Sequence, residues 1–129
     1  MRVRLAISAI LVLISIVLLT AYKPRSVPPS IGPEDLEAIL KSGRKVILVD
    51  VRPREDYLRS RLPGSHHTTA SEAITAIQHL TGDPEEEIVI ISETGREGME
   101  IVRQLQDARF GRSKFLRGGI KAWKGPLEN

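Results

Sequence analysis

The sequence predicts an α/β domain with a mostly parallel sheet flanked by helices, preceded by one N-terminal transmembrane helix. From Ile31 onward, short apolar and β-branched runs alternate with stretches of helical character, which is typical of parallel strands joined by helices. Upstream lies a long apolar segment, residues 5–21. A chain of 129 residues, 41% hydrophobic and 27% charged, suits one modest domain with an appendage.

The apolar segment is interrupted only by Ser8, Ser15 and Thr20, which a helix tolerates in lipid. As a helix it spans about 25 Å, at the short end for a bilayer crossing. It is longer than a signal-peptide core of about 7 to 15 residues. A cleavage after Ala21 would also place Leu19 where a small residue is required. An uncleaved anchor in membrane lipid is therefore favoured over a cleaved signal peptide.

The net charge of +3 comes from the ends of this segment. Arg2, Arg4, Lys23 and Arg25 flank it, so residues 31–129 hold 15 of the 19 Lys and Arg against all 16 Asp and Glu. Flanking cations suit lipid headgroups, and without a basic patch in the domain no nucleic-acid binding is expected. Arg2, Arg4 and the amino terminus slightly outweigh Lys23 and Arg25, which favours a cytoplasmic N-terminus and an extracytoplasmic domain.

Three parts follow from this pattern: an anchor at residues 1–22, a Pro-rich linker at 23–30 and a domain at 31–129. Pro24, Pro28 and Pro29 disfavour helix and predict an extended spacer.

The expected elements of the domain follow in order along the chain. Gly32 and Pro33 start a helix, and an apolar β-branched run makes the first buried strand, with Asp50 near its carboxyl end. Pro63 and Gly64 form a turn into a brief strand. The expected helices are 33–40, 52–58, 71–80, one that follows the loop after Ser92 and ends near 109–111, and 118–123; the expected strands are 46–51, one near 66–67, one that starts at 88, and 114–116.

Ser92 lies where the strand that starts at residue 88 passes through a short loop into an amphipathic helix. Such a loop turns successive backbone N–H groups toward one point, and the positive end of the following helix adds to them. The sequence therefore predicts an anion cradle, with Ser92, Thr94, Gly95 and Arg96 as candidate ligands. The whole chain contains no cysteine, which excludes disulfides and thiolate chemistry.

Four segments, VILVDVRPREDY, RLPGSHH, IVIIS with its loop, and FLRGGIKAW, resemble the rhodanese-like domain family in order and spacing, from Ile31 to about Gly125. The resemblance implies a five-stranded parallel sheet flanked by helices. In active members the loop begins with a cysteine that carries sulfur as a persulfide, and Ser92 occupies that position. Gly95 matches the loop glycine.

Other positions depart from the family. Glu97 and Gly98 stand where many members carry Arg and Ser, and Arg61 replaces the usual histidine before the Pro-Gly turn. A serine hydroxyl is not appreciably ionised at neutral pH, so sulfur transfer and the related loop-thiolate phosphatase chemistry are both excluded. Glu93, Arg96 and Glu97 sum to one negative charge, which should weaken anion binding.

We therefore predict a pseudo-enzyme: a membrane-anchored, catalytically inactive module that binds or scaffolds an unknown protein partner, with no cofactor. One alternative is an anion-binding sensor that uses the retained loop. The other is a thiosulfate sulfurtransferase-type enzyme, disfavoured by the missing cysteine.

For the remaining candidate residues we expect structural roles. Asp50 and Arg52 are expected to support the loop, either through loop N–H groups or as an ion pair. A hydrolase-type Ser92 is disfavoured because no G-x-S-x-G elbow is present. Extended neighbours His66 and His67 would point to opposite faces, so no metal site is expected. His79 is expected to favour the end of its helix, and the aromatic residues Trp123, Phe110 and Phe115 are expected in the core.

Overall fold

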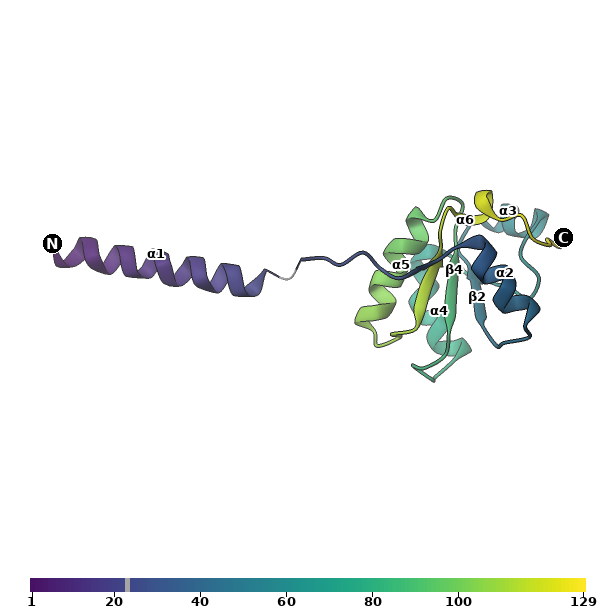
Figure 1. Cartoon of the computed structure of the whole chain (residues 1–129), viewed down its shortest axis with the longest axis horizontal. Helices are drawn as coiled ribbons and strands as arrows, with labels where there is room; N and C mark the ends of the chain where they lie inside the picture. The colour runs from purple at the N-terminus through teal and green to yellow at the C-terminus, as the bar shows by residue number, and fades with distance from the viewer. Residues whose placement is uncertain (23) are drawn as a thin grey trace.

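The computed structural model describes residues 1–22 and 24–129, and it contains a five-stranded, all-parallel sheet with helices on both faces. The strand order is β1-β5-β4-β2-β3 (Figure 1). The strands are β1 (Ser30–Ile31), β2 (Ile47–Asp50), β3 (His66–His67), β4 (Ile88–Ile91) and β5 (Ser113–Leu116). The predicted fold class is confirmed.

The helices separate the strands as the alternation predicts. They are α1 (Arg2–Ala21), α2 (Pro33–Lys41), α3 (Arg54–Arg59), α4 (Ala73–Leu80), α5 (Arg96–Asp107) and α6 (Gly119–Ala122), with one 3-10 turn at Ala70–Glu72 before α4. Pro33 occupies the first turn of α2, where a missing N–H costs nothing, and Glu34 and Asp35 favour the positive end of the helix. His79 lies in the last turn of α4, as expected.

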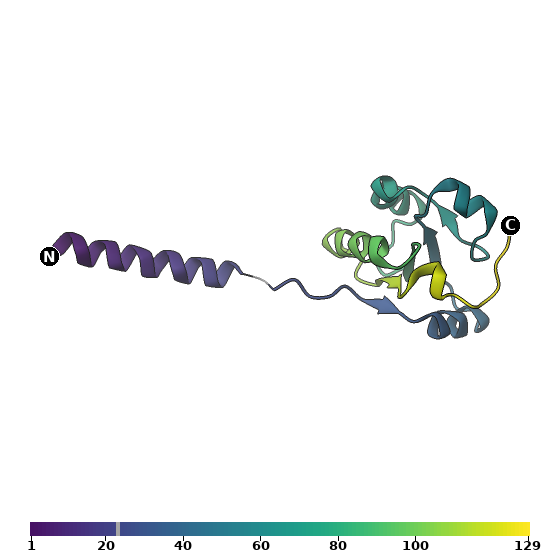
Figure 2. The same cartoon turned by 90° about the horizontal axis from the view of Figure 1, so that it is seen from above.

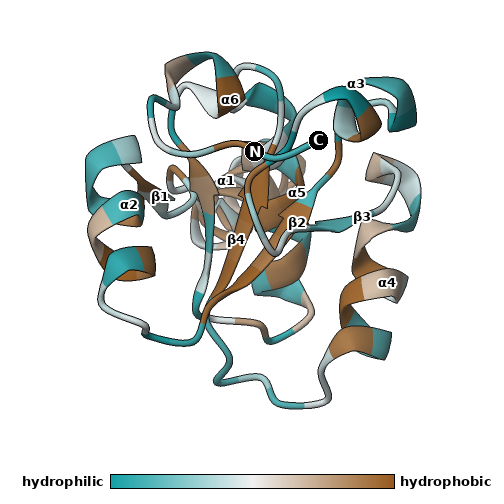
Figure 3. Ribbon diagram, turned by 90° about the vertical axis from the view of Figure 1, so that its right-hand side faces the viewer, coloured by the Kyte–Doolittle hydropathy of each residue, from teal (hydrophilic) through white to brown (hydrophobic). Residues whose placement is uncertain are grey.

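The central strand β4 is buried on both faces, so alternate residues feed two separate cores. Ile88 and Ile90 pack on the side of α4 and α5, whereas Val89 and Ile91 pack on the side of α2 and α6. Figure 2 shows α2 and α5 on opposite sides of the sheet, and Figure 3 shows β2 and β4 as its most hydrophobic part. Such strands read as continuous apolar runs.

The expected aromatic core is found for two of the three residues. Phe110 belongs to the core on the α5 side and Trp123 to the core on the α2 side, where its indole N–H donates to the Pro126 carbonyl. Phe115 is half-buried and packs against the first of these cores.

Strand β1 was not predicted, because two residues beside prolines carry no periodicity. Ser30 and Ile31 pair with Phe115 and Leu116 of β5, and the Pro29 carbonyl accepts a hydrogen bond from the Phe115 N–H at 3.1 Å. The end of the predicted linker is therefore part of the sheet. The Pro28 side chain is also buried.

Helix α1 is three residues longer at its start than the apolar segment and includes Arg2 and Arg4. Its 20 residues correspond to about 30 Å, close to the hydrocarbon thickness of a bilayer. None of its residues is buried, and it is long and apolar enough to cross a membrane, a test that a signal sequence near the N-terminus also passes. In Figure 1 it stands apart from the domain.

Candidate functional site: the loop that starts at Ser92

The loop between β4 and α5 lies at the carboxyl edge of the sheet. Strand β4 ends at Ile91, and α5 begins at Arg96, immediately after Gly95. Gly95 has a φ of +93°, a left-handed conformation that glycine adopts without strain. The structure therefore brings Ser92, Thr94, Gly95 and Arg96 into the compact loop that the sequence predicts.

Ser92 closes this loop from the inside. Its side chain is buried, and its Oγ accepts hydrogen bonds from the N–H groups of Gly95 at 3.0 Å and Gly98 at 3.3 Å. Two of the N–H groups that could hold an anion are thus satisfied by the protein's own hydroxyl. An anion would have to displace this hydroxyl to reach them.

Helix α6 holds the outer side of the loop. The Ile120 N–H donates to the Ser92 carbonyl at 2.9 Å, and the Lys121 N–H donates to the Glu93 carbonyl at 3.2 Å. These contacts tie the backbone of the loop to the helix. Gly119 makes the close approach possible, because a Cβ at this position would lie 2.3 Å from the Glu93 carbonyl oxygen.

Gly98 packs closely on the inner side of the loop. A Cβ there would lie 3.3 Å from Ser92 Oγ and 3.2 Å from the Phe115 Cβ. The glycine therefore lets the first turn of α5 approach the serine. The sequence reasoning treated Gly98 only as a departure from the family and missed this packing role.

The mouth of the loop is acidic. A hollow of about 430 Å³ is lined by Ser92, Glu93, Thr94, Arg96, Glu97 and Glu100. The side chains of Glu93, Arg96 and Glu97 are exposed, so their charges face the solvent above the loop. Glu100 was missed by the sequence reasoning, although its spacing of three residues from Glu97 on a helix places both on one face.

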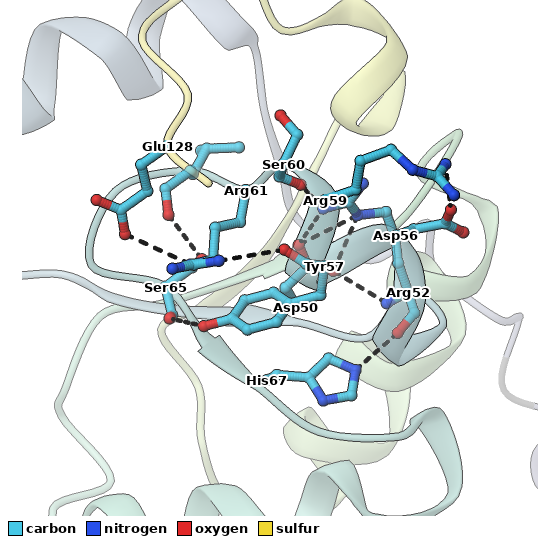
Figure 4. Close-up of polar contacts among 11 residues, drawn as sticks. Asp50, Arg52, Asp56, Tyr57, Arg59, Ser60, Arg61, Ser65, His67 and Glu128 are labelled. Carbon is cyan, nitrogen blue, oxygen red and sulfur yellow. Dashed lines mark hydrogen bonds and ion pairs between the residues drawn. The ribbon is translucent and has the colours of Figure 1, made fainter.

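The predicted pair Asp50 and Arg52 forms (Figure 4), and among the described residues its side-chain hydrogen bonds join the two residues to each other and to Ser60, not to the loop. The Arg52 guanidinium donates from Nε to both Asp50 carboxylate oxygens at 3.1 Å and from Nη2 to Oδ2 at 2.8 Å. Nη2 also donates to the Ser60 carbonyl. Both side chains are buried, so the pair ties β2 to the end of α3.

Next to this pair, Figure 4 shows a second group of contacts, which centre on Tyr57 of α3. His67 Nε2 lies 2.8 Å from the Arg52 carbonyl, so this nitrogen carries the proton and donates. The Tyr57 ring lies 4.9 Å from the His67 ring and 5.0 Å from the Arg61 guanidinium. Arg61, in the place of the family's histidine, also pairs with Glu128. His66 is exposed.

A larger hollow of about 530 Å³ continues from the loop toward β3. Glu97 lines both hollows, and Arg52, Arg54, His67 and Glu72 line the second. Within residues 1–22 and 24–129, no side chain accepts a hydrogen bond from Ser92 Oγ, so Ser92 is not paired with a general base in this structure. Above the buried hydroxyl, the hollow at the loop presents mainly carboxylates to a ligand.

Replacing Ser92 with alanine tests its role as an acceptor. The Gly95 and Gly98 N–H groups would lose their partner, and we expect Ser92→Ala to lower the free energy of unfolding by about 1 to 3 kcal/mol. Unfolding in denaturant, followed by the fluorescence of the single tryptophan, measures the change.

Ser113→Ala is the matched control, because Ser113 is as buried as Ser92 but its hydroxyl acts as a donor, to the Phe110 carbonyl. The Ser113 N–H donates to the same carbonyl, which therefore keeps a partner in the variant. This variant leaves no donor unpaired. Equal stability of the two variants would contradict the assigned role of Ser92.

Comparison with known proteins agrees with this architecture. The family model described as Rhodanese-like domain matches residues 32–126. The sequence is 24% identical over 105 residues to the adenylyltransferase and sulfurtransferase UBA4 of Candida albicans, a match that covers 77% of this chain and 24% of that protein.

Solved structures show the same fold. A thiosulfate sulfurtransferase from Pseudomonas aeruginosa has a TM-score of 0.73 at 21% identity, over 79% of this chain and 20% of that one. A rhodanese-like domain protein from Staphylococcus aureus has a TM-score of 0.68 at 24% identity, over 78% and 96% of the two chains. This chain thus spans about a quarter of UBA4 and a fifth of the Pseudomonas enzyme.

Proposed function

The chain belongs to the rhodanese-like domain family, and from this premise we propose that it is a catalytically silent, membrane-anchored member that binds or scaffolds a protein partner. The observation that carries the proposal is the state of Ser92. The family's reaction needs a thiolate that accepts sulfur, and the chain has no cysteine at this position or elsewhere. The serine hydroxyl is instead buried and used as a hydrogen-bond acceptor within the loop.

Charge supports the same proposal. The substrates of active members are anions, and three carboxylates with one guanidinium line the mouth here. Repulsion would lower the occupancy of thiosulfate or phosphate at the loop. A mouth of this charge is better suited to a partner that presents cationic side chains.

Helix α1 supports the membrane part of the proposal. Its length and hydropathy fit a bilayer crossing, and Arg2 and Arg4 at one end with Arg25 after the other fit the two headgroup layers. With the cytoplasmic N-terminus that these charges favour, the domain lies on the extracytoplasmic side, a short linker away from the surface.

An activity assay tests the proposal. We expect the full chain in detergent micelles to transfer no sulfur from thiosulfate to cyanide above the rate of a Ser92→Ala control. We expect Ser92→Cys to gain little, because Glu97 stands where a cation is needed to hold the sulfur donor. Adding Glu97→Arg to Ser92→Cys should raise turnover well above that of the single variant.

Three outcomes would change the proposal. Turnover by the wild-type chain would overturn the silent state, and strong activity of Ser92→Cys alone would remove the argument from charge. Saturable binding of thiosulfate, sulfate or phosphate at millimolar concentration or below, lost in Arg96→Ala, would favour an anion sensor instead.

A further inference from the structure

A third hollow lies between the linker and α5, on the side of the domain where the chain arrives from α1 (Figure 1). Its volume is about 320 Å³. It belongs neither to the loop of Ser92 nor to the hollow beside β3. Its walls are Pro24, Arg25, Ser26, Pro28 and Pro29 from the linker, and Arg103, Gln106 and Asp107 from α5.

Arg103 lines this hollow, and its side chain has an unused donor. Its Nη1 donates to the Glu100 carboxylate, but its Nε is buried and has no hydrogen-bond partner among the described residues. A buried donor without an acceptor is costly, and a ligand oxygen next to this edge of the guanidinium would remove the cost. Because the Arg103 side chain as a whole is about 30% exposed, a rotation of the guanidinium can bring Nε to such an oxygen.

Arg25 supplies a second guanidinium from the opposite wall. Guanidinium groups bind phosphate and carboxylate oxygens through paired N–H donors. Two of them on facing walls of one hollow, one with an unsatisfied N–H, fit a phosphate better than a neutral ligand.

The position along the chain points to the source of that phosphate. Arg25 follows the end of α1 at Ala21 by four residues, which extend over about 14 Å at most. Each headgroup layer of a bilayer is about 5 to 8 Å thick. With α1 in a membrane, as proposed above, Arg25 and the linker wall of the hollow are within reach of the lipid headgroups. The inference rests on that part of the proposed function.

The hollow contains a carboxylate, that of Asp107, in addition to the two arginine side chains. A headgroup that carries both a phosphate and a primary amine matches this lining, because the ammonium donates hydrogen bonds to a carboxylate. A choline headgroup has no N–H to donate, and a glycerol headgroup has no positive charge. We propose that the hollow binds the phosphoethanolamine headgroup of a membrane phospholipid, with the phosphate between Arg25 and Arg103 and the ammonium on Asp107.

Lipid retention in native mass spectrometry tests this site. The full chain in maltoside micelles is titrated with phosphatidylethanolamine, phosphatidylcholine, phosphatidylglycerol or diacylglycerol of identical acyl chains. Diacylglycerol measures the contribution of the chains alone. We expect phosphatidylethanolamine to bind about tenfold more tightly than diacylglycerol, the effect of one charge-assisted hydrogen bond or more, and more tightly than the other two phospholipids.

Variants test which side chains bind the phosphate and which binds the ammonium group. Arg25→Gln and Arg103→Gln should each lower the affinity for all three phospholipids toward that for diacylglycerol, whereas Asp107→Asn should bring phosphatidylethanolamine down to the level of phosphatidylcholine. Arg109→Gln is the control, because it removes the same charge just beyond the end of α5 without lining the hollow, and it should change nothing.

Equal retention of phosphatidylethanolamine and diacylglycerol, or retention unaffected by Arg103→Gln, would overturn the site. Competition by soluble glycerophosphoethanolamine at a concentration equal to that of the lipid would overturn the assignment to a membrane lipid. Flotation of the full chain with liposomes distinguishes failure of this inference from failure of the proposed anchor. A chain that does not float contradicts the membrane anchor, whereas a chain that floats without headgroup preference contradicts only the lipid site.

Discussion

Gly119→Ala is expected to unfold most of the domain at room temperature or to lower its free energy of unfolding by about 3 to 5 kcal/mol, through overpacking together with backbone strain. The added Cβ would lie 2.3 Å from the Glu93 carbonyl oxygen and 2.5 Å from that of Ser92. Both atoms belong to the loop backbone, so the clash is relieved only by moving the loop or α6. The φ of +65° adds strain for any residue with a Cβ.

Gly43→Ala is the matched control for Gly119→Ala. Gly43 has a φ of +75°, but a Cβ there meets nothing within 4 Å. It should therefore cost only the strain of a left-handed residue, about 1 to 2 kcal/mol. Denaturant unfolding monitored by Trp123 fluorescence compares the two, since this tryptophan reports on the domain and not on α1. Equal midpoints would show that the approach of α6 to the loop does not limit stability.

The position of the loop could be predicted from the sequence, but the roles of Ser92 and Gly119 within it could not. The place of the loop follows from the pattern of a buried strand before an amphipathic helix. The use of the serine hydroxyl as an internal acceptor does not follow, because it depends on where the N–H groups of Gly95 and Gly98 point. The support from Gly119 depends in the same way on a contact between segments 26 residues apart.

The fold was predictable for a related reason. Strands such as β4 carry their signal within four residues, all of them buried and β-branched. Strand β1 has two residues and exists only because β5 offers a free edge, so no local pattern identifies it. The hollow at Arg103 was likewise beyond sequence reasoning, since its walls come from the linker and the far end of α5.

These features place two different surfaces on one small domain. The acidic mouth lies at the carboxyl edge of the sheet, beyond the start of α5, whereas the hollow with Arg25 and Arg103 lies along the later turns of the same helix. Helix α5 therefore carries part of both proposed surfaces, and the ion pair of Arg103 with Glu100 lies between them. A headgroup bound at Arg103 would hold the helix toward the membrane and leave the mouth of the loop free for a partner.

Arg52→Met is expected to be the second most damaging single change, because it leaves the Asp50 carboxylate buried without its cation. Removing one partner of a buried ion pair costs about 3 to 5 kcal/mol, whereas replacing both partners can be nearly neutral. Asp50 is fully buried, and two of its three donor nitrogens belong to the lost guanidinium. The Ser60 carbonyl loses a donor as well.

The double variant Asp50→Asn with Arg52→Met separates lost packing from the buried charge. The asparagine side-chain carbonyl can still accept from the main-chain N–H of residue 52, as Asp50 Oδ1 does at 3.0 Å, but it carries no charge. We therefore expect the double variant to be more stable than Arg52→Met alone by about 1 to 3 kcal/mol, measured by the same denaturant unfolding in a double-mutant cycle. If the double variant is instead less stable than Arg52→Met, the cost lies in the hydrogen bonds that join β2 to α3, and the pair acts as a structural clamp rather than as charge compensation.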